Sequence, residues 1–197
     1  MSGHLIAFEG LDQSGKETQV RRLRDHLEAR GHRCEWLSFP DYDTLLGREI
    51  GRALQGQREY DAEVTQLLFV ANRYEYRAQI EQWLGEGVIV LCDRYLASTI
   101  AYGEAQDLDP DWLTEIQRFL PQPALTIFLD IVPETAVRRK SANRDRYERD
   151  LALLSRVRAS YTRQADRPGW HRIDGERAKE DVASEVATVV TARLARP

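Results

Sequence analysis

The sequence is poor in the features that mark secreted, membrane-bound and nucleic-acid-binding proteins. It has only two cysteines, Cys34 and Cys92, far apart and without C-x-x-C spacing, which excludes a disulfide framework and a paired-cysteine zinc or redox site. A net charge of -4 gives no overall positive field for nucleic acid or anionic membranes. The most apolar run, 88–92, is too short to span a bilayer, and the N-terminus has no signal-peptide pattern. We therefore expect a cytoplasmic protein that binds neither membranes nor nucleic acid.

What is present is sufficient for one α/β domain. The chain has 197 residues, of which 42% are hydrophobic, a size that suits a single core. Short β-type runs alternate with longer helical patterns, and two runs are nearly continuous in apolar residues, as in a parallel sheet covered on both faces. No repeat or low-complexity linker divides the chain, so we predict a single domain over 1–197. Strands are predicted at 4–9, 33–39, 87–93, 124–130 and 169–174, and helices at 16–30, 61–84, 96–118, 133–165 and 177–195.

The stretch FEGLDQSGKET, residues 8–18, contains the G-x-x-x-x-G-K spacing of a phosphate-binding loop. A strand pattern precedes it and a helical pattern follows, so the backbone N–H groups of the loop and the helix N-terminus would face one polyphosphate, and Lys16 would reach its β- and γ-phosphates. The alternative for the two glycines is a tight strand-to-helix turn. The predicted ATP-binding residues are Gly10, Leu11, Asp12, Gln13, Ser14, Gly15, Lys16, Glu17 and Thr18.

Glu17 occupies the position where the loop pattern has a magnesium-binding Ser or Thr. A carboxylate beside the β-phosphate would cost about 1 to 4 kcal/mol of repulsion unless a cation lies between them. Mg²⁺ reverses that sign and needs only one or two protein oxygens. Asp93 ends an apolar strand, where P-loop proteins place a metal-facing aspartate, although an aspartate there is also a common helix cap. We predict Mg²⁺ near Asp93 and Glu17; the alternative is a nucleotide-binding protein that has lost catalysis.

The predicted helix 61–84 has one apolar stripe, with Phe69 and Arg73 on the opposite side. We expect the stripe to face the core and the pair to face a ligand. Taken singly, Phe69 could pack on another helix and Arg73 could be a solvated cation. Phe39 and Tyr42, which follow the second strand, would line the same pocket or belong to the core. The stripe consists of Val64, Leu67, Leu68 and Ala71.

The segment 138–149, RRKSANRDRYER, has six basic residues in twelve. A solvated helix end with local ion pairs and a short nucleic-acid patch are two interpretations of such a cluster. An apolar stripe at helical spacing follows it and predicts a helix that is held to the core. The stripe consists of Leu151, Leu154, Val157 and Tyr161.

Five segments, in this order, resemble thymidylate kinases, which phosphorylate dTMP with ATP: FEGLDQSGKETQ, LLFVANRYE, LCDRYLASTIAY, PALTIFLD and DRYERDLALLSRVRASY. The resemblance covers nearly the whole chain and implies a three-layer P-loop kinase fold, a parallel five-stranded sheet with helices on both faces, and a homodimer. It implies that Arg94 grips the dTMP phosphate, that Asp93 works near the metal and that Tyr102 lies under the deoxyribose. Asp12 would contact the acceptor sugar or the metal shell.

The same resemblance implies a thymine site in LLFVANRYE, with Phe69 stacked on the base and Arg73 donating to a carbonyl oxygen. Segment 138–149 becomes the lid over ATP, and it would supply a catalytic arginine because Gln13 replaces a basic loop residue. A kinase for another nucleotide or for a deoxynucleoside is the alternative within the enzyme class. The predicted substrate-binding residues are Asp12, Phe39, Tyr42, Phe69, Arg73, Arg94, Ser98, Thr99 and Tyr102, and the predicted catalytic residues are Lys16, Asp93, Arg94, Arg144, Arg146 and Arg149.

Overall fold

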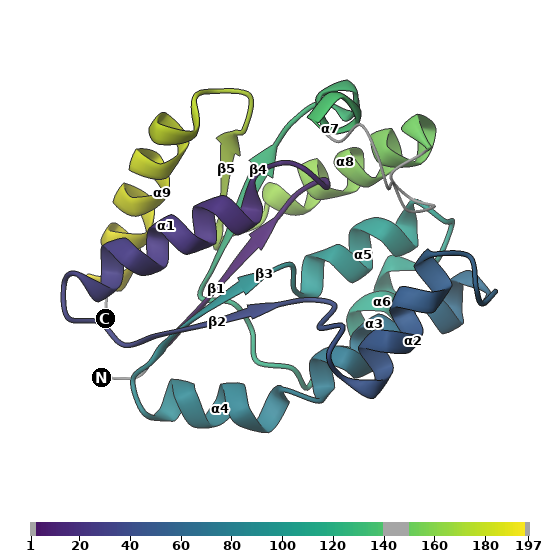
Figure 1. Ribbon diagram of the computed structural model, residues 1–197, viewed down its shortest axis with the longest axis horizontal. Helices are drawn as coiled ribbons and strands as arrows, with labels where there is room; N and C mark the ends of the chain where they lie inside the picture. The colour runs from purple at the N-terminus through teal and green to yellow at the C-terminus, as the bar shows by residue number, and fades with distance from the viewer. Residues whose placement is uncertain (1–2, 140–149, 196–197) are drawn as a thin grey trace.

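The computed structural model describes residues 3–139 and 150–195, which fold around a parallel five-stranded sheet (Figure 1). The strand order is β2-β3-β1-β4-β5, so β1 lies at the centre and pairs with β3 and β4. The central strands are buried on both faces, which explains their continuous apolar runs. All five predicted strands are confirmed to within two residues at each end: β1 (His4–Glu9), β2 (Cys34–Ser38), β3 (Ile89–Asp93), β4 (Leu125–Asp130) and β5 (Trp170–Asp174).

Helices cover both faces of the sheet, as predicted. One face packs against α1 and α9 through an aliphatic cluster that includes Val20, Leu23 and Val186, and the two helices lie side by side in Figure 1. The opposite face packs against α4, α5 and α8. The helices are α1 (Lys16–Glu28), α2 (Leu45–Leu54), α3 (Ala62–Tyr74), α4 (Arg77–Gly85), α5 (Leu96–Glu104), α6 (Pro110–Glu115), α7 (Pro133–Arg139), α8 (Leu151–Ala165) and α9 (Lys179–Leu194).

The helix predictions were wrong in their division of the chain. Segment 61–84 forms α3 and α4, and 96–118 forms α5 and α6. The break between α3 and α4 has neither glycine nor proline, so no helix-breaking residue marks it. Predicted helix 133–165 includes α7 and α8, while 140–149 lies outside the described residues. Helix α2 was missed, although Thr44 caps its first turn by accepting a hydrogen bond from the Gly47 backbone N–H.

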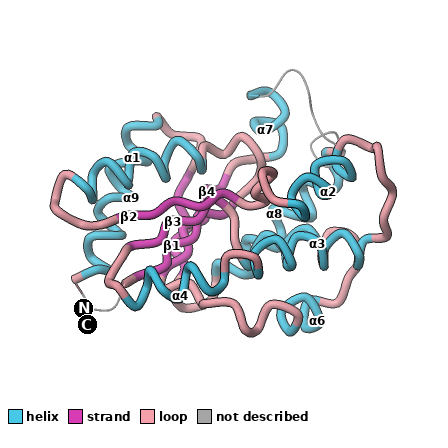
Figure 2. Tube along the Cα trace, turned by 60° about the horizontal axis from the view of Figure 1, so that its bottom comes forward, coloured by secondary structure: helices cyan, strands magenta, loops and turns pink. Residues whose placement is uncertain are grey.

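The predicted core face of α3 was also wrong. Val64 is 40% exposed and Leu67 is 44% exposed, whereas the buried side of the helix is mostly polar. The reason is that α3 packs beside α2 and α5 rather than flat on the sheet, and α2 and α3 lie together away from α1 and α9 in Figure 2. The buried side consists of Thr65, Gln66, Val70, Asn72 and Arg73.

The stripe predicted for α8 is confirmed except at its first position. Leu154, Val157 and Tyr161 are buried against the sheet and α5. Leu151 is 45% exposed because it is the first residue of the helix. In 3–139 and 150–195, no helix is both long enough and apolar enough to cross a membrane.

Candidate active site

The phosphate-binding loop connects the central strand β1 to α1, and its two glycines are required by the geometry. Gly10 has a φ of 141°, and a Cβ atom there would lie 2.5 Å from the carbonyl oxygen of Leu129 on β4. Gly15, the N-cap of α1, has a φ of 96°. Only glycine adopts these conformations without strain. The loop can therefore pass close to β4 and present the N-terminus of α1 to a ligand, an arrangement that favours phosphate binding.

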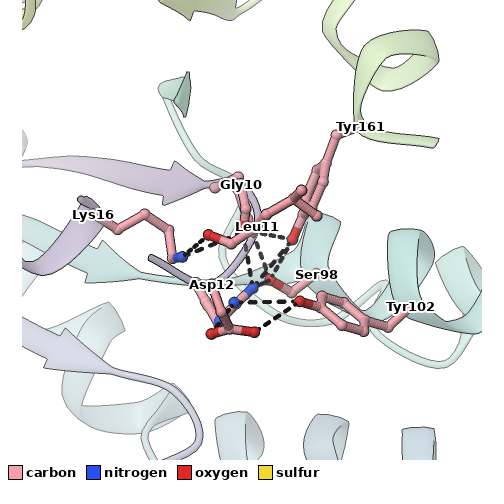
Figure 3. A network of polar contacts seen from close by, with 9 residues as sticks. Gly10, Leu11, Asp12, Lys16, Ser98, Tyr102 and Tyr161 are labelled. Carbon is pink, nitrogen blue, oxygen red and sulfur yellow. Dashed lines mark hydrogen bonds and ion pairs between the residues drawn. The ribbon is translucent and has the colours of Figure 1, made fainter. Parts of the chain in front are cut away.

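Lys16 is held over the loop by backbone oxygens. Its side chain is only 5% exposed, and Nζ donates to the carbonyl oxygens of Leu11 at 2.9 Å and Gly10 at 3.2 Å (Figure 3). Burial lowers the pKa of Lys16, and the charge of Arg94 lowers it further, whereas nearby carboxylates raise it. The ammonium group thus lies in the bend of the loop, where phosphate oxygens can replace these carbonyl partners.

Arg94 follows β3 directly and is turned back towards the phosphate-binding loop. Its backbone is left-handed, with a φ of 63°, a conformation that costs a non-glycine residue about 1 kcal/mol or more. Its guanidinium donates to Asp12 at 2.7 Å and to the Gly10 carbonyl oxygen at 3.2 Å. Its guanidinium also contacts three hydroxyl groups, those of Ser98, Tyr102 and Tyr161, whose side chains are labelled in Figure 3.

The Asp12 carboxylate is ionised because of these neighbours. Burial alone would raise its pKa, but the charges of Arg94 and Lys16, with hydrogen bonds from Arg94 and Tyr102, outweigh burial and lower the pKa to about 2. The Tyr102 hydroxyl donates to the second carboxylate oxygen at 3.1 Å. Asp12 and Arg94 therefore form a pre-ordered charged pair between the loop and α5.

Glu9 is a buried carboxylate beside the site that the sequence analysis did not single out. It is fully buried at the end of β1 and accepts hydrogen bonds from the Tyr95 backbone N–H at 2.8 Å, Ser98 Oγ at 2.6 Å and Tyr161 Oη at 3.2 Å. These bonds join β1, the start of α5 and α8 beneath Arg94. The available signal was a glutamate at the end of an apolar strand, since a buried carboxylate requires such partners.

A cavity opens beside Arg94, lined by residues of the phosphate-binding loop, α3 and α5. Arg73 enters it from α3, donates to Thr99 Oγ1 at 2.5 Å and lies 5.9 Å from the ring of Phe39. The structure thus brings together all the residues predicted to bind the substrate, and adds three that the sequence analysis missed: Pro40, Leu54 and Gln66.

A second, more open cavity lies over the phosphate-binding loop and includes Lys16, Thr18 and Asp93. It shares Asp12, Arg94 and three residues that follow β2 with the first cavity, so two ligands bound side by side would meet where this charged pair lies. Arg139, at the end of α7, was not singled out by the sequence analysis. It donates to the carbonyl oxygens of Gln13 at 3.1 Å and Gly175 at 3.0 Å, which brings a further cation to the loop.

Comparisons of the sequence and of the fold with known proteins identify one family. The family model described as "Thymidylate kinase" matches residues 8–186. The chain belongs to the thymidylate kinase family. It is 36% identical to a thymidylate kinase of Arabidopsis thaliana over 95% of this chain and 71% of that protein, and 33% identical to one of Homo sapiens over 93% and 88%. A solved thymidylate kinase of Candida albicans has a TM-score of 0.83 at 28% identity, covering 97% of this chain and 92% of its own.

Membership of the thymidylate kinase family confirms the resemblance inferred from the sequence. Three of the predicted catalytic residues, Arg144, Arg146 and Arg149, lie outside the described residues. Among the described residues, Asp93 ends β3 close to Lys16 and Arg94; burial raises its pKa, and these two cations act against that rise.

Glu17 also lines the cavity over the phosphate-binding loop. Its carboxylate bonds Arg21 at 2.8 Å, one turn along α1, and its side chain is 64% exposed.

Proposed function

We propose that the protein transfers the γ-phosphoryl group of ATP to dTMP, giving dTDP and ADP, as the family requires. The observation that carries the proposal is the meeting of two cavities at Asp12 and Arg94. ATP occupies the cavity over the phosphate-binding loop, and dTMP occupies the cavity beside α3 with its phosphate directed at Arg94. A nucleoside would leave this arginine without a ligand, so a monophosphate is the better acceptor.

A turnover assay with ATP, Mg²⁺ and a panel of monophosphates tests this function. We expect dTMP to be preferred over dUMP, dCMP and UMP. UMP is disfavoured because the aromatic ring of Tyr102 would lie under the sugar and crowd its 2′-hydroxyl. Equal turnover of UMP and dTMP, or turnover of neither, would contradict the proposal. Binding of ATP and dTMP without turnover would instead indicate a nucleotide-binding protein that has lost catalysis.

Catalysis by this site consists of positioning and charge neutralisation. Lys16 neutralises the donor phosphates, and Arg94 aligns the acceptor phosphate once it exchanges Asp12 for the ligand. Mg²⁺, when bound with ATP, supplies further positive charge between the phosphate oxygens. Mg²⁺ keeps several waters and needs only one or two protein oxygens, so a single carboxylate can serve as its protein ligand. We assign Asp93 as the metal-facing carboxylate.

Replacing Glu17 by serine is expected to leave the Mg²⁺ concentration for half-maximal rate unchanged. The Glu17 carboxylate pairs with Arg21 on the exposed side of α1, so its loss removes only an exposed ion pair of about 0.3 to 0.5 kcal/mol. The measurement is a Mg²⁺ titration of the initial rate for the wild type and Glu17→Ser, with Arg21→Ala as the matched control. A shifted Mg²⁺ dependence in Glu17→Ser alone would restore Glu17 as a metal ligand.

Replacing Phe69 or Arg73 by alanine is expected to weaken dTMP binding while ATP binding stays nearly unchanged. Both side chains line the acceptor cavity and neither lines the cavity over the loop. A base-stacking ring and a charge-assisted hydrogen bond each contribute about 1 to 3 kcal/mol, so affinity should fall roughly 5- to 150-fold. Separate titrations with dTMP and ATP measure the effect. Equal losses for both nucleotides, together with a lower melting temperature, would show that these residues only support the fold.

The family resemblance also implies a homodimer, which we propose here. Exposed apolar side chains on neighbouring helices support it, because they would be covered in a dimer. Sedimentation of the purified protein at micromolar concentration tests it. The exposed side chains are Leu45 on α2 and Val64 and Leu67 on α3.

The free cysteines Cys34 and Cys92 agree with the cytoplasmic location proposed for this enzyme.

A further inference from the structure

Gln66 is a buried glutamine whose side chain makes no hydrogen bond to the described residues. It is 0% exposed, and neither its Nε2 nor its Oε1 has a hydrogen-bond partner among the described residues. Gln164 is a useful contrast, because it is also buried but its Nε2 donates to the Ala97 carbonyl oxygen and to Ser160 Oγ, both at 3.3 Å. An unpaired buried polar atom costs about 1 to 3 kcal/mol, so the Gln66 amide requires an explanation.

The position of Gln66 indicates what its partner is. Gln66, Phe69 and Arg73 follow one another at i, i+3 and i+7 on α3, which puts them on one face of the helix. All three line the acceptor cavity. Nε of Arg73 is likewise buried without a partner in the described part of the chain. The unused hydrogen-bonding atoms of α3 are therefore gathered beside the ring that is expected to stack on the base.

The chemistry of these atoms matches one edge of a pyrimidine. The Gln66 amide offers a donor and an acceptor, and Arg73 offers donors only. Thymine and uracil present a carbonyl, an N3–H and a second carbonyl, which require donor, acceptor and donor in turn. Cytosine presents an amino group and a bare N3 in the first two positions. The Gln66 amide could rotate to suit cytosine, but the Arg73 guanidinium, placed at the 4-position of the base, has no acceptor for the amino group that cytosine carries there, so the pair rejects cytosine.

We propose that Gln66 is a specificity-determining residue that accepts a hydrogen bond from the N3–H of the acceptor base and donates to one of its carbonyl oxygens. This inference rests on the proposed function and names the part of the base that the acceptor cavity recognises. It selects imide bases, thymine and uracil, against cytosine. The hydrogen bonds of Gln66 do not involve the thymine methyl group, so the affinities for dTMP and dUMP should fall together when Gln66 is changed.

The variant Gln66→Met separates this role from a structural one, because methionine keeps the shape but removes the amide. We expect the affinity for dTMP to fall roughly 5- to 150-fold, the equivalent of one buried hydrogen-bond partner, with ATP affinity unchanged. The melting temperature of the ligand-free protein should stay the same or rise, because two unpaired polar atoms leave the interior. In the control Gln164→Met the melting temperature should fall, since that amide is used inside the protein, and dTMP affinity should be unaffected.

A modified substrate tests the contact directly. N3-methyl-dTMP lacks the N3–H, so the wild type should bind it at least tenfold more weakly than dTMP, and this penalty should shrink at least threefold in Gln66→Met. Equal binding of both nucleotides by the wild type, or the same methylation penalty in both proteins, would overturn the inference, as would a lower melting temperature of Gln66→Met. Failure of the proposed function is distinct, because the wild type would then not phosphorylate dTMP at all.

Discussion

Replacing Arg94 by alanine is expected to lower kcat/KM for dTMP roughly 30- to 700-fold, the equivalent of about 2 to 4 kcal/mol for a truncated partner of a hydrogen-bonded charge pair. The Arg94 side chain is only 13% exposed and its bond to Asp12 is 2.7 Å long. Its removal therefore leaves the Asp12 carboxylate without its main partner. The variant should also unfold at a lower temperature, because Asp12 loses a buried partner. Steady-state kinetics and thermal unfolding measure the two effects. Arg94→Lys keeps the charge without the planar fork and should recover stability more than turnover.

The pH dependence of stability distinguishes a lost charge pair from general damage. In the wild type the pKa of Asp12 is lowered from 3.8 to about 2, so its contribution to the free energy of unfolding is present above pH 4 and is lost as the pH falls towards 2. In Arg94→Ala burial is no longer opposed by Arg94, and the pKa of Asp12 rises. The difference in free energy of unfolding between the wild type and Arg94→Ala should therefore become smaller below pH 4. A constant gap would show that the loss does not come from Asp12.

Alanine at one of the three predicted lid arginines, Arg144, Arg146 or Arg149, is expected to lower kcat more than tenfold with little change in dTMP affinity. Gln13 is neutral, so the phosphate-binding loop itself offers only Lys16 to the charge that builds during transfer. An arginine delivered to a transferring phosphoryl group contributes about 10³ to 10⁵ in rate. A loss in kcat that leaves the affinity intact is the signature of an interaction made mainly in the transition state.

The control for the lid arginines is Arg156→Ala, which removes an exposed arginine from α8 outside the predicted lid. Single-turnover kinetics should separate the phosphoryl-transfer step from product release. Near-normal kcat in all three lid variants would mean that the missing cation comes from Arg94, or from Arg139, which already contacts the Gln13 carbonyl oxygen. Arg139→Ala then becomes the decisive substitution.

The sheet was predictable from the sequence because its strands carry their own signal. Residues 89–93 and 125–130 are buried on both faces, and only a continuous apolar run suits that environment. The phosphate-binding loop could be predicted as well. Its geometry requires glycine at positions 10 and 15, and this spacing between a strand and a helix is visible in the sequence.

The orientation of α3 could not be predicted by the same reasoning. Hydrophobic periodicity assumes that the buried face of a helix is apolar, whereas α3 buries Asn72 and Arg73. Asn72 is tolerated because its amide binds Thr44 at 3.0 Å and Glu75 at 2.9 Å, and the Thr44 bond joins α3 to the cap of α2, a helix that the sequence analysis did not include. A polar face that lines a binding site looks like an exposed face in the sequence.

The hydrogen bonds between Glu9, Tyr161 and Arg94 bear on how the affinities for the two substrates depend on each other. Tyr161 Oη contacts both Glu9, at 3.2 Å, and Arg94, at 3.4 Å, and Tyr161 belongs to α8, whose first residue follows the segment of the predicted lid. We expect an acceptor phosphate that engages Arg94 to compete with its bond to Tyr161, and so to affect the packing of α8. If α8 and the donor cavity share that change, dTMP and ATP affinities are thermodynamically linked, and each substrate must alter the affinity for the other by the same factor.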